Sequence, residues 1–174
     1  MNYFVLAAGT VILVVISWLV SIREKRFHGI ARFFSFESIF ILFLMNWRMW
    51  FHDPFSWNQL IAWVLLFLSI YPVVAGFILL KRKGKSEKSL ENTTVLIKSG
   101  IYNHIRHPLY CSLLLLGTGI MFKDPGLLQI TAGAVNIIAL FFTARIEEKE
   151  MTKRFGDQYT DYMKETKMFI PYLV

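Results

Sequence analysis

Two groups of ionisable side chains lie about forty residues apart in this 174-residue chain. The first is the stretch GIYNHIRHPLY at 100–110, where Arg106 and His107 directly precede Pro108. Proline has no backbone N–H to lose in the first turn of a helix, so Pro108 predicts a helix start. The free N–H groups of that turn, the positive end of the helix dipole and Arg106 together favour an anion-binding site. Contact of Arg106 and His107 with lipid phosphates is an equally good interpretation of these residues alone.

The second group is a pair of carboxylates, Glu147 and Glu148, which follows Arg145 in a segment with helical spacing. Glutamates on a helix often pair with basic residues three or four positions away, and Arg145, Lys149 and Lys153 offer such partners. For an isolated pair of glutamates, this pairing is the favoured interpretation. A site with both anionic and cationic groups forms only if the fold brings the two groups together.

A third set lies in the apolar stretch SFESIFILFLMNWRMWF, which contains Glu37 and Arg48. Ionisable side chains within a membrane span usually face the interior of a helix bundle or a cavity. Glu37 lies near one end of the stretch and Arg48 near the other, where long side chains also reach the interface. Both residues are therefore candidates for contact with a substrate.

The composition indicates a membrane protein, since 55% of the residues are hydrophobic and 16% are aromatic. Its single cysteine, Cys111, excludes an intramolecular disulfide and any cysteine cluster for a metal. The net charge of +7 collects in loops between apolar segments, so it does not indicate a nucleic-acid partner. The expected partner is the lipid bilayer. The oligomeric state stays open.

Five apolar segments predict an all-α, polytopic membrane protein with about five transmembrane helices. The N-terminal stretch of roughly 20 residues is read as a retained first span, because it lacks the basic start of a signal peptide. The other spans are expected at about 34–51, 57–80, 108–122 and 126–144.

The chain is expected to form one membrane domain over 1–174, whose parts we predict as follows. Residues 1–80 form three N-terminal spans, 81–107 a cytoplasmic loop with the entrance to the site, 108–144 a helical hairpin, and 145–174 cytoplasmic helices. Within the loop, the polar stretch at 81–94 is expected to be flexible.

The distribution of Lys and Arg predicts the orientation in the membrane. The connections carry four basic residues in 23–33, none in 52–57, seven in 81–107, one in 123–125 and six in 145–174. Because cytoplasmic loops carry the excess of basic residues, this alternation places the N-terminus outside and the C-terminus in the cytoplasm.

The turn sequence KDPG predicts that the last two spans form an antiparallel hairpin. Small residues should let these two helices approach closely in lipid: Gly117, Gly119, Ala132, Gly133 and Ala134. The last helix is expected to continue into the cytoplasm and to stop near Phe155 and Gly156, with Asp157 capping a short amphipathic helix. Tyr159 and Tyr162 share one face of that helix.

The C-terminal half resembles the isoprenylcysteine carboxyl methyltransferase family of integral membrane methyltransferases, with phospholipid methyltransferases as more distant relatives. The resemblance rests on GIYNHIRHPLY, followed about forty residues later by EEKEMTKRFGDQYTDYMKET, and covers roughly 93–171. Ser112 departs from the pattern, because relatives often have glycine at this position.

The resemblance implies methyl transfer from S-adenosylmethionine, which leaves S-adenosylhomocysteine, to a lipophilic acceptor that enters from the bilayer. Carried over by position, the cofactor-binding residues would be Tyr102, His104, Arg106, His107, Pro108, Tyr110, Glu147 and Glu148. Arg145 would lie toward the acceptor, so Arg145 and Glu148 are the catalytic candidates and Arg145, Glu37 and Arg48 the substrate candidates. No metal is expected, because the histidines and glutamates lack the spacing of a ligand set.

The acceptor remains open between several classes. A prenylcysteine carboxylate is already anionic, needs no general base, and would be oriented by a cation such as Arg145. An amine acceptor such as a phospholipid headgroup must lose a proton, so Glu148, Glu37 or His104 would act as its base. Other small lipophilic amines or thiols, and a membrane binding or scaffold protein without catalysis, are the further alternatives.

Overall fold

The computed structural model describes residues 3–22, 28–83 and 95–171. Within these ranges the chain is built from helices, which run in the order α1 (Tyr3–Ser17), η1 (Trp18–Ile22), α2 (His28–Asn46), η2 (Trp47–Met49), α3 (Trp57–Lys83), η3 (Gly100–Asn103), α4 (Pro108–Phe122), α5 (Leu127–Phe155) and α6 (Asp157–Glu165). The predicted all-α class is confirmed. The predicted flexible loop falls mostly on 84–94, outside the described residues.

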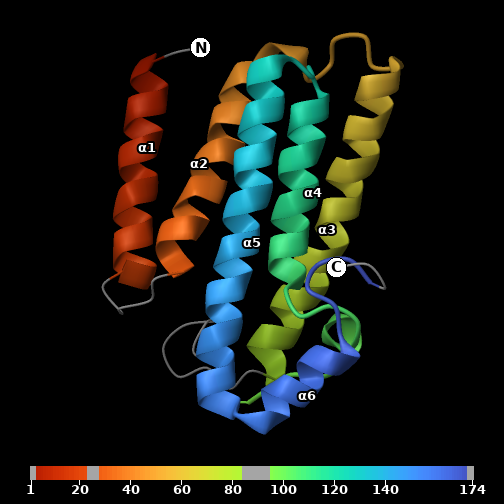
Figure 1. Cartoon of the computed structure of the whole chain (residues 1–174). Helices are drawn as coiled ribbons and strands as arrows, with labels where there is room; N and C mark the ends of the chain where they lie inside the picture. The colour runs from red at the N-terminus through yellow and green to blue at the C-terminus, as the bar shows by residue number, and fades with distance from the viewer. Residues whose placement is uncertain (1–2, 23–27, 84–94, 172–174) are drawn as a thin grey trace.

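The helices α1 to α5 lie side by side, and α6 lies across the lower end of the bundle (Figure 1). In the described part of the chain, four helices are long and apolar enough to cross a membrane, and α4 is a shorter apolar helix. The chain is therefore an integral membrane protein. The second span differs from the expectation of 34–51, since α2 begins at His28 and ends at Asn46. Arg32 was counted among the basic residues of the predicted connection 23–33, but it lies within α2. Its Nη2 donates a hydrogen bond to the hydroxyl of Ser21 at 2.5 Å.

Buried amide side chains join α2 to the C-terminal hairpin. Ser35 donates to Asn136 Oδ1 at 2.6 Å, and Asn136 Nδ2 donates to the carbonyl of Leu113 at 3.3 Å. Further up, Asn46 donates to the carbonyl of Ile120 at 2.7 Å. In lipid, where apolar contact gives little driving force between helices, such hydrogen bonds fix which helix faces touch.

The predicted hairpin is present, but its small residues serve more than one interface. A Cβ on Gly119 would lie 3.2 Å from the carbonyl oxygen of Ala62, so this glycine brings α4 close to α3. A Cβ on Gly133 would lie 2.7 Å from Met121 Sδ, which is the expected contact between α4 and α5. Ala134, which was expected at the contact, is exposed.

The difference in length between the hairpin's two helices creates space beneath α4. At about 1.5 Å per residue, the 29 residues of α5 span about 44 Å, whereas the hydrocarbon core of a bilayer is about 30 Å thick. Since α4 has only 15 residues, α5 continues well beyond the start of α4. The chain from 95 to 107, α6 and the segment after α6 fill this space (Figure 1).

The lower end of α5 follows the sequence prediction closely. The helix ends at Phe155, and Gly156 has φ +57°, a conformation that favours glycine. Gly156 is also the N-cap of α6, so the expectation that Asp157 would be the capping residue is wrong. Tyr159 and Tyr162 are both buried, as expected for one face of α6.

Candidate functional site

A short parallel pairing of two backbone segments holds the loop that precedes α4. The N–H of Arg106 donates to the carbonyl of Lys167 at 2.8 Å, and the N–H of His107 donates to the carbonyl of Met168 at 3.1 Å. In return, the N–H of Lys167 donates to the carbonyl of His104 at 3.1 Å. The segment after α6 therefore sets the direction of the Arg106 and His107 side chains.

Arg106 and Glu148 form a buried ion pair between this loop and α5. The Arg106 Nε donates to Glu148 Oε1 at 2.7 Å, and the two side chains are 9% and 4% exposed. The Arg106 Nη1 donates to the carbonyl of Thr166 and, at 3.3 Å, to that of Met163. The two groups of ionisable residues that are separate in the sequence thus lie together in the fold.

His107 lies between the two glutamates. Its Nδ1 is 3.7 Å from Glu147 Oε2, its Nε2 is 3.5 Å from Glu148 Oε1, and its ring stacks on Tyr110 with centroids 5.4 Å apart. Within the described residues, His107 Nε2, Glu147 Oε2 and Glu148 Oε2 are buried and have no hydrogen-bond partner. Because buried polar atoms are normally paired, these atoms favour a bound ligand that offers polar groups.

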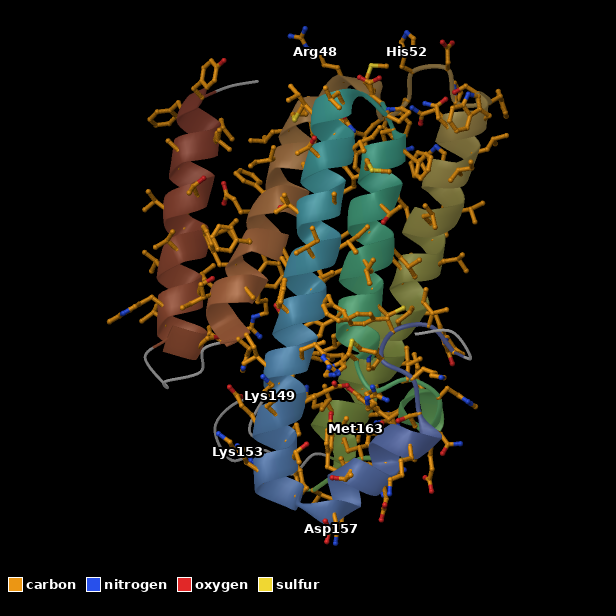
Figure 2. All side chains as sticks on the ribbon, viewed as in Figure 1. Arg48, His52, Lys149, Lys153, Asp157 and Met163 are labelled. Carbon is orange, nitrogen blue, oxygen red and sulfur yellow. The ribbon has the colours of Figure 1, made fainter. Side chains whose placement is uncertain are left out.

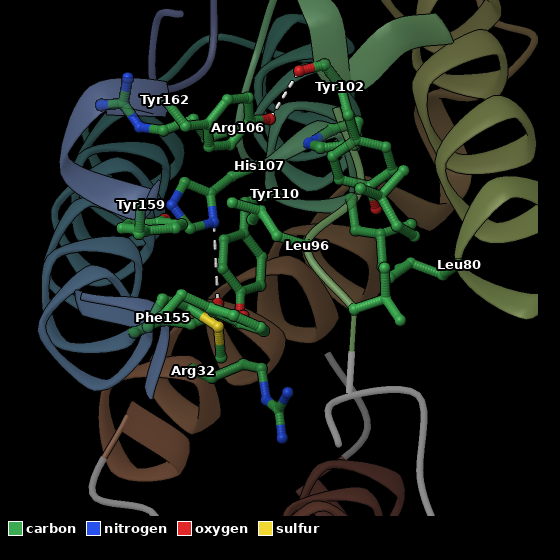
Figure 3. Close-up of a pocket in the computed structure, with 16 residues that line it drawn as sticks. Arg32, Leu80, Leu96, Tyr102, Arg106, His107, Tyr110, Phe155, Tyr159 and Tyr162 are labelled. Atoms are coloured by element: carbon green, nitrogen blue, oxygen red, sulfur yellow. Dashed lines mark hydrogen bonds and ion pairs between the residues drawn. The ribbon is translucent and has the colours of Figure 1, made fainter. Parts of the chain in front are cut away.

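A cavity of about 230 Å³ opens beside these residues (Figure 3). Its aromatic lining consists of Tyr102, Tyr110, Phe155, Tyr159 and Tyr162, and its charged lining of Arg32, Arg106 and Glu147. His107 and Pro108 complete the wall at the start of α4. The cavity therefore combines flat aromatic faces with a few charged groups, as sites for small organic ligands commonly do.

Three tyrosines of the cavity are kept in their neutral form by their surroundings. Burial raises the pKa of the Tyr102, Tyr159 and Tyr162 phenols above the usual value of a tyrosine. The negative charges of nearby glutamates raise the pKa further, Glu147 for Tyr102 and both glutamates for Tyr159. The Tyr162 hydroxyl donates to the carbonyl of Tyr102 at 2.6 Å, which joins α6 to η3. These phenols therefore offer ring faces and hydrogen bonds, but no charge.

The structure brings most of the predicted cofactor residues to this cavity. Those that line it are Tyr102, Arg106, His107, Pro108, Tyr110 and Glu147. Glu148 lies behind them, bonded to Arg106. Two predicted residues lie elsewhere: His104 is exposed, and Arg145 is 56% exposed, with its Nη1 3.7 Å from Glu148 Oε2. Neither lines the cavity.

The two polar residues of the second span are also apart from the cavity. Glu37 faces α1, where its Oε1 accepts a hydrogen bond from Thr10 at 2.6 Å. Arg48 lies at the opposite end of the bundle from Met163 and Asp157 (Figure 2). The geometry gives Glu37 a role in holding α1 against α2, and it keeps Arg48 away from the cavity.

The sequence did not single out Arg32, which lines the cavity from α2. The basic residues of 23–33, which include Arg32, were used only to predict the orientation in the membrane. No local sequence pattern links residue 32 to the residues near 107. Phe155 and Met151 of α5 were missed as well, although both lie at helical spacing from Glu147 and Glu148. From this helical spacing, both residues could have been predicted to lie on the same face of α5 as the glutamates.

Comparison with known proteins identifies the family of this chain. Residues 57–158 match the phospholipid methyltransferase family. The matched range runs from the start of α3 into α6 and so contains Arg106, His107 and both glutamates, whereas α1 and α2 lie outside it.

The chain is also similar to curated proteins from animals and plants. It is 34% identical over 95 residues to the protein-S-isoprenylcysteine O-methyltransferase of Mus musculus, and the same holds for that of Rattus norvegicus. It is 34% identical over 82 residues to protein-S-isoprenylcysteine O-methyltransferase A of Arabidopsis thaliana. The alignments cover 51% and 45% of this chain, but only 31% of the rodent proteins and 40% of the plant protein.

Proposed function

Since this chain belongs to the phospholipid methyltransferase family, we propose that it transfers a methyl group from S-adenosylmethionine to a lipophilic acceptor at the membrane. The acceptor that we propose is the carboxylate of a prenylcysteine-like molecule. The observation that carries the proposal is the cavity beneath α4, where Glu147 Oε2 and His107 Nε2 are buried without a hydrogen-bond partner in the described part of the chain.

The residues of the cavity fit S-adenosylmethionine. Glu147 offers a carboxylate for its ammonium or ribose hydroxyls, and the rings of Tyr102, Tyr159 and Tyr162 offer flat faces for its adenine. His107 and the N–H groups at the start of α4 offer donors for its carboxylate. When bound, this cofactor supplies a methyl group already activated on a sulfonium. The task of the protein is then to orient both partners and to exclude water.

The rodent and plant relatives are protein-S-isoprenylcysteine O-methyltransferases, and this similarity supports a carboxylate acceptor. A carboxylate at neutral pH attacks without losing a proton, so it needs no general base. An amine acceptor, which the family's name suggests, would need one. Of the bases predicted for that case, His104 is exposed, Glu37 is bonded to Thr10, and Glu148 is bonded to Arg106. Their positions favour the carboxylate.

In this proposal Glu148 acts through Arg106 and His107, which it holds in place. The predicted catalytic role of Arg145 stays a prediction, because its guanidinium is largely exposed beside Glu148 and outside the cavity lining. The charge distribution supports a cytoplasmic cavity, with the N-terminus outside. Lys149 and Lys153 lie at the cavity's end of the bundle (Figure 2).

The test is a labelled-methyl assay with purified protein in detergent. S-adenosylmethionine with a labelled methyl group is offered with an S-farnesylcysteine, with phosphatidylethanolamine, or with a native lipid extract. We expect label in the farnesylcysteine as a base-labile methyl ester, and inhibition by S-adenosylhomocysteine. Label in phosphatidylethanolamine alone would establish the amine alternative. If no acceptor is labelled and S-adenosylhomocysteine does not bind, the remaining interpretation is a membrane scaffold protein without catalysis.

A further inference from the structure

The imidazole of His107 lies between two carboxylates, and its orientation decides what it can offer to a ligand. Its Nδ1 is 3.7 Å from Glu147 Oε2 and its Nε2 is 3.5 Å from Glu148 Oε1, so each ring nitrogen faces a different glutamate. Rotation of an imidazole about its bond to Cβ has broad preferences, so the side chain alone does not fix this orientation. Contacts with neighbouring residues must therefore hold the ring.

Among the described residues, the imidazole makes ring contacts with Tyr110 and Phe169, which come from different parts of the chain. Tyr110 stacks on it, with centroids 5.4 Å apart and an angle of 17° between the planes. Tyr110 follows His107 by three residues in α4 and itself lines the cavity (Figure 3). Phe169 contacts the imidazole with centroids 6.2 Å apart and an angle of 53°. Both separations lie in the range of about 4.5–7 Å in which aromatic rings attract each other.

Phe169 belongs to the segment that follows α6, and this segment is paired with the loop before α4. The carbonyl of Met168 accepts a hydrogen bond from the N–H of His107 at 3.1 Å, which brings the next residue, Phe169, close to the imidazole. Phe169 is only 4% exposed, and it does not line the cavity. It therefore contacts a residue of the cavity wall and leaves the cavity itself to the ligand.

On these grounds we propose that Phe169 is a positioning residue for the methyl transfer, because its ring fixes the imidazole of His107 in the orientation that meets the cofactor. The inference rests on the proposed function, in which His107 offers a hydrogen bond to the carboxylate of S-adenosylmethionine. Phe169 lies outside the range 57–158 that matches the family, so the match does not assign it a role. The consequence to be tested is that Phe169 affects the cofactor only through His107.

The experiment is a double-mutant cycle on the full chain in detergent, in which equilibrium titration gives the dissociation constant of S-adenosylhomocysteine. The variants are Phe169→Leu, which replaces the ring by another apolar side chain, His107→Gln, and the two combined. The matched control is Met168→Ala, which truncates a buried side chain of the same segment, alone and combined with His107→Gln. Such a cycle separates an effect that passes through His107 from a general loss of packing.

We expect Phe169→Leu to weaken S-adenosylhomocysteine about 3- to 10-fold when His107 is present and less than about 2-fold in the His107→Gln background, as loss of an aromatic contact predicts. The effect of Met168→Ala should be the same in both backgrounds. Equal effects of Phe169→Leu in both backgrounds would show that the ring only adds to the core, and would overturn the proposal. Coupling of the same size for Met168→Ala would overturn it too, since any loss of packing would then disturb His107. If Phe169→Leu does not fold, Phe169→Met replaces it in the cycle, because methionine adapts to irregular space.

The orientation of the imidazole can also be measured without the cofactor. In protein with ¹⁵N-labelled histidine, the ring signals of His107 are identified by their loss in His107→Gln. The shifts of Nδ1 and Nε2 report the proton and the hydrogen bonds of each nitrogen, which depend on what that nitrogen faces. We expect both shifts to change in Phe169→Leu and to stay in place in Met168→Ala. Unchanged shifts in Phe169→Leu would mean that the ring does not hold His107.

The two proposals therefore fail in different ways. If the His107 signals change in Phe169→Leu, but the wild type neither binds S-adenosylhomocysteine nor methylates an acceptor, the proposed function fails and the contact of Phe169 still orients His107. If methyl transfer occurs, while Phe169→Leu leaves both the His107 signals and the affinity for S-adenosylhomocysteine unchanged, the function stands and the positioning role of Phe169 fails.

Discussion

Two glutamates that are adjacent in the sequence have different surroundings in the fold. Glu147 lines the cavity, and its Oε2 has no hydrogen-bond partner in the described residues. Glu148 is only 4% exposed and is bonded to Arg106. The first glutamate is therefore placed to meet a ligand, and the second to hold the wall of the cavity in position.

The substitution Glu147→Gln tests the first of these roles. It keeps the size of the side chain but removes its charge, which costs roughly 1.5–3 kcal/mol for a hydrogen bond to a charged group. We expect the dissociation constant of S-adenosylhomocysteine, measured by calorimetric titration, to rise at least tenfold, with an unchanged unfolding temperature. Unchanged affinity would mean that Glu147 does not contact the cofactor.

The substitution Glu148→Gln tests the second role, with Glu147→Gln as its matched control. Breaking a buried ion pair leaves the partner's charge uncompensated and costs about 3–5 kcal/mol. We therefore expect a lower unfolding temperature in detergent for Glu148→Gln, because Arg106 loses the carboxylate that balances it. Two variants with equal unfolding temperatures would contradict this division of roles.

At the scale of the elements, α4 is held from two sides. Gly119 allows contact with α3, and Asn136 of α5 hydrogen-bonds to the carbonyl of Leu113. The upper turn is fixed as well, since the buried Lys123 donates to Gln59 Oε1 of α3 at 2.9 Å and lies over the Trp63 ring. Because the upper end of α4 is fixed in this way, its lower end has a defined position in the bundle. This position places His107 at the cavity.

The substitution Gly119→Val should separate α3 from α4. A Cβ added at this position would lie 3.1 Å from Leu66 Cγ and 3.2 Å from the carbonyl oxygen of Ala62, and overpacking of this kind costs about 1–3 kcal/mol. We expect a lower unfolding temperature than for Ala134→Val, which adds bulk to an exposed residue of the hairpin. Equal stability of the two variants would show that α3 and α4 do not pack closely at Gly119.

At the scale of the whole molecule, the cavity draws on segments that are far apart in the sequence. α2 brings Arg32, the start of α4 brings His107, α5 brings Glu147 and α6 brings Tyr159. The start of α2, the start of α4 and α6 lie toward the lower end of the bundle (Figure 1). This end carries Lys149 and Lys153 and is opposite Arg48 and His52 (Figure 2). The cavity that these segments line therefore lies at one end of the bundle.

The orientation can be measured with two single cysteines in a Cys111→Ala background. His52 and Lys153 are exposed at opposite ends of the bundle. We expect a membrane-impermeant thiol reagent to label His52→Cys in intact cells and Lys153→Cys only after the membrane is opened, since basic loops stay in the cytoplasm. Labelling of both positions from one side would contradict the five-span topology.

The sequence by itself determined the features that depend on neighbouring residues. Composition established the membrane class, Pro108 the start of α4, and Gly156 the end of α5. That the two groups of ionisable residues lie at the same end of the bundle could be predicted for a related reason, because a short turn between two helices returns the chain to the side from which it came. The hairpin places Arg106 and Glu148 on the same side, and the fold joins them in an ion pair.

Only the tertiary structure decided which face of each helix meets which neighbour. A helix in lipid is apolar on its outer and its inner side, so hydrophobic periodicity does not distinguish them. Gly119 was therefore assigned to the wrong neighbour, and Arg32 was read as a topology signal. The contact of Arg32 with the cavity depends on how α2 packs against α5 through Ser35 and Asn136, a long-range fit that no local pattern encodes.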